Sequence, residues 1–296
     1  MSISVIIPVY NSSVFLPLLF ESIKNQKLGN ENFEVNFVDN NSTDGSDEDI
    51  KAFIDSNDAL NLNYLKYNET QSSYAARNFG CLNSNGNVLA FTDADCILHE
   101  EWLINIFNFY TISQNIETII AGDIKLILES NSAIWENFDY VGFLDNEKTF
   151  YSGAGGATAN LIVPKKVFKD IGEFLPVKSG GDFEWSLRAF ERKFMFVFKR
   201  DILVYHPTRK TFKEIRKKFL RIAEGRAERY KLRGKDTLVV LAYEFVRIFN
   251  VITIVRFVKK LLPRIGLLRT IVFVPGFFLL RIQQFFKIMR TLFLSI

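Results

Sequence analysis

The sequence predicts an α/β fold with a mostly parallel central sheet. Short apolar, β-branched runs alternate with helical stretches through the first two thirds of the chain, and one run ends in two aspartates, Asp93 and Asp95. Such alternation is typical of a parallel sheet with helices on both faces. At 296 residues, the chain is long enough for one large α/β domain and an appendage.

The expected elements follow one another in regular order. Strands are expected at residues 3–9, 33–38, 62–67 and 88–92, and later at 119–126, 158–163 and 202–205. Helices are expected at residues 14–26, 46–56, 73–84, 183–192 and from about 211 to 230.

The charge of the chain is divided unevenly along its length. From residue 206 to the end there are 21 Lys and Arg against 5 Asp and Glu, whereas the first 205 residues carry 16 basic and 28 acidic side chains. The basic part is also rich in Phe, Leu, Ile and Val. We therefore expect an α/β domain at residues 1–210 and a basic amphipathic helical tail at residues 211–296. The tail would bind an anionic membrane surface, and no nucleic-acid partner is expected.

Two apolar stretches of the tail bear on how it would meet a membrane. Residues 238–258 contain Glu244, Arg247 and Arg256, and residues 265–280 are interrupted by an arginine, a proline and a glycine. A spanning helix needs about 20 mostly apolar residues, and a charge at its centre costs roughly 2.5–3.5 kcal/mol. We expect helices that lie in the interface, peripheral on the inner face of the cell membrane. Spanning helices, and packing against the domain or a homodimer partner, remain alternatives.

The two cysteines and the N-terminus indicate a cytoplasmic protein. Cys81 and Cys96 lie in apolar or motif segments without metal-ligand spacing, so we expect reduced core thiols and no disulfide. The chain begins at once with a strand-like run and no basic region, so no signal peptide is expected.

Asp93 and Asp95 follow an apolar run that should end at the edge of the sheet. Two neighbouring carboxylates repel each other, and a divalent cation that carries its own phosphates is the usual solution. The alternative is a turn in which the aspartates cap the next helix, expected to start near His99.

Other phosphate-binding devices are missing from the sequence. The turn after the first strand reads Pro8-Val9-Tyr10-Asn11, without the G-x-G-x-x-G of dinucleotide-binding domains, and there is no Walker lysine loop. Phosphate charge must then be neutralised elsewhere, and a metal at Asp93 and Asp95 is the obvious candidate.

Several motifs in order resemble those of family 2 glycosyltransferases. They are SVIIPVYN at residues 4–11, VDNNSTDGS at 38–46, ARNFG at 76–80, FTDAD at 91–95, NLIVP at 160–164, IGEF at 171–174 and GGDFEWSLR at 180–188. The resemblance covers about residues 1–210. It implies the GT-A nucleotide-diphospho-sugar transferase fold and a nucleotide-diphospho-sugar donor, most simply a UDP-sugar.

The resemblance also implies a cofactor. Asp95 would hold Mn²⁺ or Mg²⁺ on the donor diphosphate, and Asp93 would contact the ribose and share the metal. His206, one of two histidines, either completes the metal shell or is a packed structural residue.

The donor nucleotide would be held by the first three motifs. Asp39 would hydrogen-bond the nucleobase, with Asn41 in the same motif, while Pro8 and Tyr10 would wall the base pocket. Arg77 would reach the base or the phosphates, or else pair with a neighbouring carboxylate.

The acceptor hydroxyl needs a base, because it is a poor nucleophile. Asp182 occupies the position of the family's base, although an aspartate there would also cap the following helix. Glu184, Gly155 and Gly156 are the candidates for binding the acceptor.

Two positions depart from the family pattern. Gly181 stands where the family commonly has Glu, and Asn40 stands where Asp is frequent. Both departures concern the fit of donor or acceptor.

The function expected from these residues is inverting, metal-dependent sugar transfer to a hydroxyl of a glycan or lipid-linked acceptor. The product would be a cell-surface polysaccharide or glycolipid. Transfer to polyprenyl phosphate is one alternative, and a non-catalytic sugar- or lipid-binding relative is another.

Overall fold

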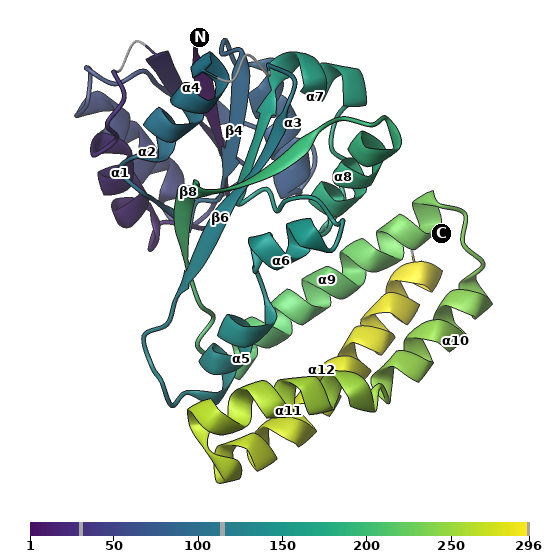
Figure 1. Ribbon diagram of the computed structural model, residues 1–296. Coiled ribbons are helices and arrows are strands. Elements are labelled where there is room, and N and C mark those ends of the chain that lie inside the picture. Colours follow the sequence, from purple (N-terminus) through teal and green to yellow (C-terminus); the bar gives the residue numbers. More distant parts are fainter. Residues whose placement is uncertain (30–31, 113–115, 295–296) are drawn as a thin grey trace. The chain divides into compact units, whose positions relative to one another are not determined.

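The computed structural model describes residues 1–29, 32–112 and 116–294 (Figure 1). The chain forms two compact units. The first unit comprises Met1–Lys125, Leu144–Pro176 and Gly181–His206, and the second comprises Leu126–Phe143, Val177–Gly180 and Pro207–Ile296. The second unit therefore includes two segments from the middle of the chain, and the boundary predicted at residue 210 stays a prediction.

The described strands form one mixed sheet, in the order β3-β2-β1-β4-β7-β6-β8-β5. The strands are β1 (Ile3–Val9), β2 (Phe33–Asp39), β3 (Leu62–Lys66), β4 (Val88–Thr92), β5 (Ile97–Leu98), β6 (Ile119–Ile127), β7 (Asn160–Pro164) and β8 (Phe196–Pro207). The predicted α/β class is confirmed. The predicted parallel pairing holds for β1 to β4, whereas β7 runs antiparallel to β4 and to β6.

The register of the parallel strands brings their carboxyl ends to one edge. Val9 at the end of β1 lies beside Asp39 at the end of β2, and β4 ends at Thr92, directly before Asp93. The antiparallel β7 begins at the same edge, because Thr92 pairs with Asn160. Polar side chains from distant parts of the sequence therefore meet there.

The first unit has helices on both faces of the sheet (Figure 1). They are α1 (Leu16–Lys24), α2 (Ser46–Asp55), α3 (Ser73–Leu82), α4 (Trp102–Ile112), α6 (Asn146–Tyr151), α7 (Lys165–Ile171) and α8 (Gly181–Glu191). The helix expected to start near His99 begins at Trp102, because the residues just before it form β5 and pair with β8.

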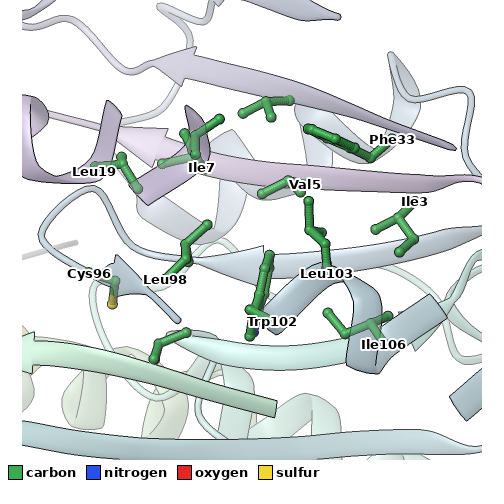
Figure 2. Close-up of a cluster of buried hydrophobic side chains, with 14 of the residues drawn as sticks. Ile3, Val5, Ile7, Leu19, Phe33, Cys96, Leu98, Trp102, Leu103 and Ile106 are labelled. Carbon is green, nitrogen blue, oxygen red and sulfur yellow. The ribbon is translucent and has the colours of Figure 1, made fainter. Parts of the chain in front are cut away.

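Alternate residues of β1 face opposite layers. Ile3, Val5 and Ile7 pack into a core with side chains of α1, α2 and α4, including the fully buried Trp102 (Figure 2). On the other face, Ile6 meets α3 at Gly80, where an added Cβ would lie 2.7 Å from the Ile6 side chain. A glycine here lets α3 approach the sheet closely.

Asn160 ties α4 to the strands beside it. Its Oδ1 accepts a hydrogen bond from the Trp102 indole (2.9 Å), and its Nδ2 donates to the carbonyls of Asp123 (2.7 Å) and Ile202 (2.8 Å). The side chain is fully buried, so each of these bonds replaces one to water.

The second unit is helical. Its elements are α5 (Ile134–Gly142), α9 (Phe212–Leu232), α10 (Thr237–Ile248), α11 (Val251–Ile265) and α12 (Leu267–Leu294). A capping box of Thr211 and Glu214 starts α9. Pro275 and Gly276, which interrupt the apolar stretch of residues 265–280, both lie inside α12. Gly276 leaves room for the ring of Trp135, which an added Cβ would approach to 2.6 Å.

Two C-terminal helical stretches are long and apolar enough to cross a membrane, by length and composition alone. They are Thr237–Ile265 and Leu267–Phe293, with mean hydropathy of 2.0 and 1.4 over their most apolar windows. About three quarters of each window is not buried within the protein (22% and 28% buried). Most residues of both windows are therefore exposed or only partly buried.

A buried charge cluster holds α5 to α9. Asp139, 1% exposed, accepts hydrogen bonds from Lys218 Nζ (2.7 Å) and from the backbone N–H (2.9 Å) and Nη1 (3.3 Å) of Arg209. Burial alone would raise the pKa of Asp139, but the charges of Lys218 and Arg209 outweigh burial and hold it below its usual value. Lys218 also lies 3.8 Å from the ring centroid of Phe143.

Asp139→Asn should therefore destabilise the protein by about 3–5 kcal/mol, because it leaves two cations partly buried without their counter-charge. Lys218→Met should cost less, since Asp139 keeps Arg209. Denaturant unfolding measures both variants. Glu129→Gln, which breaks an exposed ion pair with Lys210, is the control and should change stability by less than about 1 kcal/mol. Equal losses for the Asp139 and Lys218 variants would contradict this reading.

Candidate active site

Asp39 lies buried at the carboxyl end of β2. Its Oδ1 accepts a hydrogen bond from the backbone N–H of Ser42 (3.1 Å), and its Oδ2 accepts one from the Tyr64 hydroxyl (3.3 Å). Burial, together with the charge of Asp39, raises the pKa of Tyr64 to about 12, so the tyrosine stays a donor at neutral pH. These bonds hold the Asp39 carboxylate in place, and its oxygens can still accept a hydrogen bond from an N–H group of a ligand.

The other predicted residues of the base pocket lie near the end of β1 and in the loops that follow β1 and β2. Pro8 is partly buried near the end of β1, and Tyr10 follows it with half of its surface exposed. Asn41 adopts a left-handed backbone with φ of 69°, which asparagine tolerates better than most residues. The loop that contains Asn41 is joined to the loop after β1 by Asn11. The Oδ1 of Asn11 accepts a hydrogen bond from the Thr43 backbone N–H (2.8 Å).

Asn40 has a structural role that explains its departure from the family pattern. Its Nδ2 donates to the carbonyls of Tyr67 and Thr70 (both 3.0 Å), and its Oδ1 accepts from the Ser72 backbone N–H (2.9 Å). A carboxylate cannot donate to two carbonyls, so an aspartate would lose both of those bonds. The amide thus fixes the segment that leads into α3.

Arg77 pairs with Asp93. The guanidinium is 2% exposed, and its Nη2 contacts Asp93 Oδ1, while its Nη1 donates to the Ser73 carbonyl (3.2 Å). The pairing with a neighbouring carboxylate, considered above as one of two roles, is therefore present. The buried Nε has no hydrogen-bond partner within the described residues, and the contact with the donor stays a prediction.

Asp93, Asp95 and His206 form a candidate metal site. Their potential ligand atoms lie within 4.8 Å of one another, and His206 Nε2 is 3.4 Å from Asp95 Oδ2. The imidazole is buried, whereas the two carboxylates keep about a third and a quarter of their side-chain surface exposed. Two carboxylates and an imidazole fit Mn²⁺ well, and Mg²⁺ accepts the carboxylates. The donor set also leaves positions open for ligand oxygens.

Asp182 lies at the start of α8 and is held by a tyrosine. Its Oδ1 accepts a hydrogen bond from the Tyr74 hydroxyl (2.9 Å), and its Oδ2 lies 3.4 Å from the Thr158 backbone N–H. Tyr74 is 6% exposed, and burial followed by the charge of Asp182 raises the pKa of its hydroxyl, so the phenol remains protonated. The hydrogen bond from Tyr74 therefore orients the Asp182 carboxylate.

Helix α3 contacts the carboxylates of both Asp93 and Asp182. Tyr74 and Arg77 are three residues apart and so share a face of the helix. One side chain reaches Asp182, and the other reaches Asp93. Sequence reasoning missed Tyr74, because nothing in the chain connects residue 74 with residue 182.

The candidate acceptor residues are tied into the protein. Glu184 is 9% exposed and forms an ion pair with Arg188 (2.9 Å). A Cβ at Gly155 would lie 2.2 Å from Ser186, and one at Gly156 would lie 2.9 Å from Ala121. These contacts describe packing, and the acceptor contact of all three stays a prediction.

With this geometry in place, comparison with known proteins identifies the family. Residues 4–172 match the family described as glycosyl transferase family 2. The chain belongs to this family. It is therefore a glycosyltransferase enzyme with the predicted GT-A fold.

Two curated relatives match most of the chain. Glycosyltransferase AglE of Haloferax volcanii is 33% identical over 231 residues, which are 78% of this chain and 74% of AglE. The dolichyl N-acetyl-alpha-D-glucosaminyl phosphate 3-beta-D-2,3-diacetamido-2,3-dideoxy-beta-D-glucuronosyltransferase of Methanococcus voltae is 25% identical over 262 residues, 86% of this chain and 81% of that protein.

Two solved structures share the fold at low identity. The mannosyltransferase PcManGT of Pyrobaculum calidifontis, in complex with GDP-Man and Mn²⁺, has a TM-score of 0.62 and 15% identity, covering 99% of this chain and 88% of that chain. TarS 1-349 of S. aureus, in complex with UDP-GlcNAc, has a TM-score of 0.58 and 16% identity, covering 99% and 90%.

The site explains why residue 181 is a glycine in this family member. An added Cβ would lie 2.9–3.0 Å from the ring of Tyr74. Gly181→Ala should therefore destabilise the protein by about 1–3 kcal/mol through overpacking, despite the better helix propensity of alanine.

In a Tyr74→Ala background the same substitution should cost nothing, because the ring that it meets has gone. A double-mutant cycle of unfolding free energies measures the coupling. Additive effects of the two substitutions would show that Tyr74 does not limit position 181.

Proposed function

We propose that this family 2 glycosyltransferase is an inverting, metal-dependent enzyme. It moves a sugar from a nucleotide-diphospho-sugar, most simply a UDP-sugar, to a hydroxyl of a glycan or lipid-linked acceptor. The observation that carries the proposal is that α3 joins two sets of carboxylates, Asp93 through Arg77 and Asp182 through Tyr74. Sugar transfer needs both a site for a diphosphate and a base for a hydroxyl.

Asp95, Asp93 and His206 would hold Mn²⁺ or Mg²⁺. A bound divalent cation supplies charge that stabilises the departing diphosphate. The Mn²⁺ in the PcManGT complex supports this assignment. Arg77 would also support the metal site. Its ion pair with Asp93 offsets the repulsion between Asp93 and Asp95 before a cation binds.

Asp182 would accept the proton of the attacking hydroxyl. The hydrogen bond from the Tyr74 hydroxyl to Oδ1 orients the carboxylate. The other oxygen, Oδ2, faces the backbone N–H of Thr158. Asp39 would accept a hydrogen bond from the nucleobase, with Pro8, Tyr10 and Asn41 around the base. Direct displacement by the hydroxyl inverts the configuration of the anomeric carbon.

The acceptor and the location follow from the second unit and the relatives. The M. voltae relative is named for transfer to a dolichyl-linked sugar phosphate, which supports a lipid-linked acceptor here. The apolar, basic helices α10 to α12 would bind an anionic membrane from its inner face. We propose that the product is a cell-surface polysaccharide or glycolipid.

The metal assignment makes a direct prediction. A chelator should abolish transfer, and Mn²⁺ or Mg²⁺ should restore it. Asp95→Ala should lose transfer while keeping the unfolding temperature without metal, whereas Asp58→Ala, at an exposed aspartate, should behave as the wild type. Full transfer in the presence of chelator would remove the metal from the proposal.

The base is tested by two substitutions. Asp182→Asn keeps the shape of the side chain, so donor binding should survive while turnover falls at least about 10²-fold. Tyr74→Phe should lower kcat, about tenfold, with little change in the donor KM, because it removes the group that orients the carboxylate.

Glu184→Gln tests the rival carboxylate, which is paired with Arg188 and should matter less for turnover than Asp182. If turnover persists in Asp182→Asn and falls in Glu184→Gln, the roles are reversed. NMR of the product should show the anomeric configuration opposite to that of the donor, and retention would contradict direct displacement.

The membrane proposal predicts binding to lipid vesicles. The full-length protein should float with vesicles that contain anionic lipid and bind neutral phosphatidylcholine vesicles less, at about 1 kcal/mol for each basic side chain near the surface. High salt or alkaline carbonate should release part of it, because screening weakens surface binding. Full retention in carbonate would instead indicate helices that span the bilayer.

A further inference from the structure

Helix α10 exposes apolar side chains and buries a charge. Its most exposed apolar side chains are Leu238, Val239, Tyr243, Phe245 and Val246. Glu244 is only 4% exposed and lies on the buried face together with Val240 and Ile248. A buried charge of this kind is costly unless its partners are close.

Glu244 is fully engaged by three neighbours. It accepts hydrogen bonds from Arg226 Nη1 (3.0 and 3.3 Å), from Arg247 Nη1 (3.1 Å) and from the Tyr230 hydroxyl (2.9 Å). Arg226 and Tyr230 belong to α9, so this carboxylate joins α10 to α9. One carboxylate thus already serves two guanidinium groups.

A third guanidinium stands near the cluster without a counter-charge of its own. Arg281 of α12 interacts electrostatically with Arg247, Arg226 and Glu244. Burial, followed by repulsion from the two arginines, lowers the pKa of Arg281 to about 10. Its Nε is buried and has no hydrogen-bond partner within the described residues. Helix α12 packs against both α9 and α10, which places the three arginines on adjoining helices (Figure 1).

We propose that Arg226, Arg247 and Arg281 form a binding site for the phosphate monoester of a membrane lipid. Three guanidinium groups and one carboxylate leave two positive charges. A phosphate monoester carries about −1.5 to −2 at neutral pH, which matches that excess, and guanidinium groups bind phosphate oxygens through paired N–H groups.

The surroundings favour a lipid over a free anion. Arg247 keeps 28% of its side chain exposed, and Arg281 is also partly exposed, so a ligand can reach both. On the same two helices, exposed apolar side chains such as Val246, Ile282 and Phe286 lie within five residues of these arginines. A ligand with a phosphate head and an apolar chain satisfies both kinds of surface. The site rests on the proposed membrane attachment and gives it a specific headgroup.

The test compares vesicles of matched surface potential that contain either phosphatidic acid, a monoester, or phosphatidylglycerol, a diester. The full-length wild type should prefer the monoester by about tenfold, the effect of one charged hydrogen bond. Arg281→Gln should abolish the preference. Arg290→Gln removes the same charge from an exposed position of the same helix and should keep the preference. If both variants show the same preference for phosphatidic acid, the protein binds by general electrostatic attraction and the proposed site is wrong.

A titration without vesicles separates this site from membrane attachment. Soluble dihexanoyl phosphatidic acid should bind the wild type and bind Arg281→Gln at least about tenfold more weakly. Inorganic phosphate should bind more weakly than the short-chain lipid, and equal binding would indicate a site for free phosphate instead. If the wild type ignores all vesicles but binds the short-chain lipid, membrane attachment fails and the site stands. If it binds vesicles but not the short-chain lipid, and shows no monoester preference, the site fails alone.

Folding of the variants is checked by circular dichroism. Arg281→Lys keeps the charge and loses the paired N–H groups, so it should retain part of the preference if Arg281→Gln proves unstable. A wild-type preference undiminished in Arg281→Lys would show that charge alone, without guanidinium geometry, accounts for binding.

Discussion

Repulsion between two aspartates at the end of β4 is the constraint on which the site depends. Asp93 and Asp95 leave the strand one residue apart, and the protein places a nitrogen-bearing side chain beside each of them. Arg77 is brought to Asp93 by α3, and His206 is brought to Asp95 by the end of β8. Both partners are nearly buried, whereas the two carboxylates remain partly exposed.

Close packing of α3 on the sheet makes this arrangement possible. Gly80 lets the helix approach Ile6, and Asn40 fixes the turn that starts the helix. From the same helix, Tyr74 holds Asp182. A shift of α3 would therefore move the contacts of both Asp93 and Asp182. Gly181 packs against the ring of Tyr74, so a larger residue there would displace the side chain that holds Asp182.

The second unit shows a different balance of forces. Its helices share buried apolar clusters, but they also bury charges around Asp139 and Glu244 and leave many large apolar side chains exposed. The cluster around Asp139 contains two cations for one carboxylate, and the cluster around Glu244 has three arginines nearby. These features are the basis of the proposed binding to an anionic membrane surface.

The sequence by itself determined the α/β class, the family and the residues at strand ends, because strand periodicity and motif order are local properties of the chain. It could not give the antiparallel β7 at the same edge, the ligand geometry of His206, or the hydrogen bond between Tyr74 and Asp182. Those depend on which strands pair and on how closely α3 packs, and both are decided by contacts between residues far apart in the chain. The burial of Glu244 in α10 could likewise not be read from its composition, since only the tertiary structure shows that Glu244 pairs with Arg226 of α9. Local pattern fixed the elements, and long-range packing fixed the site.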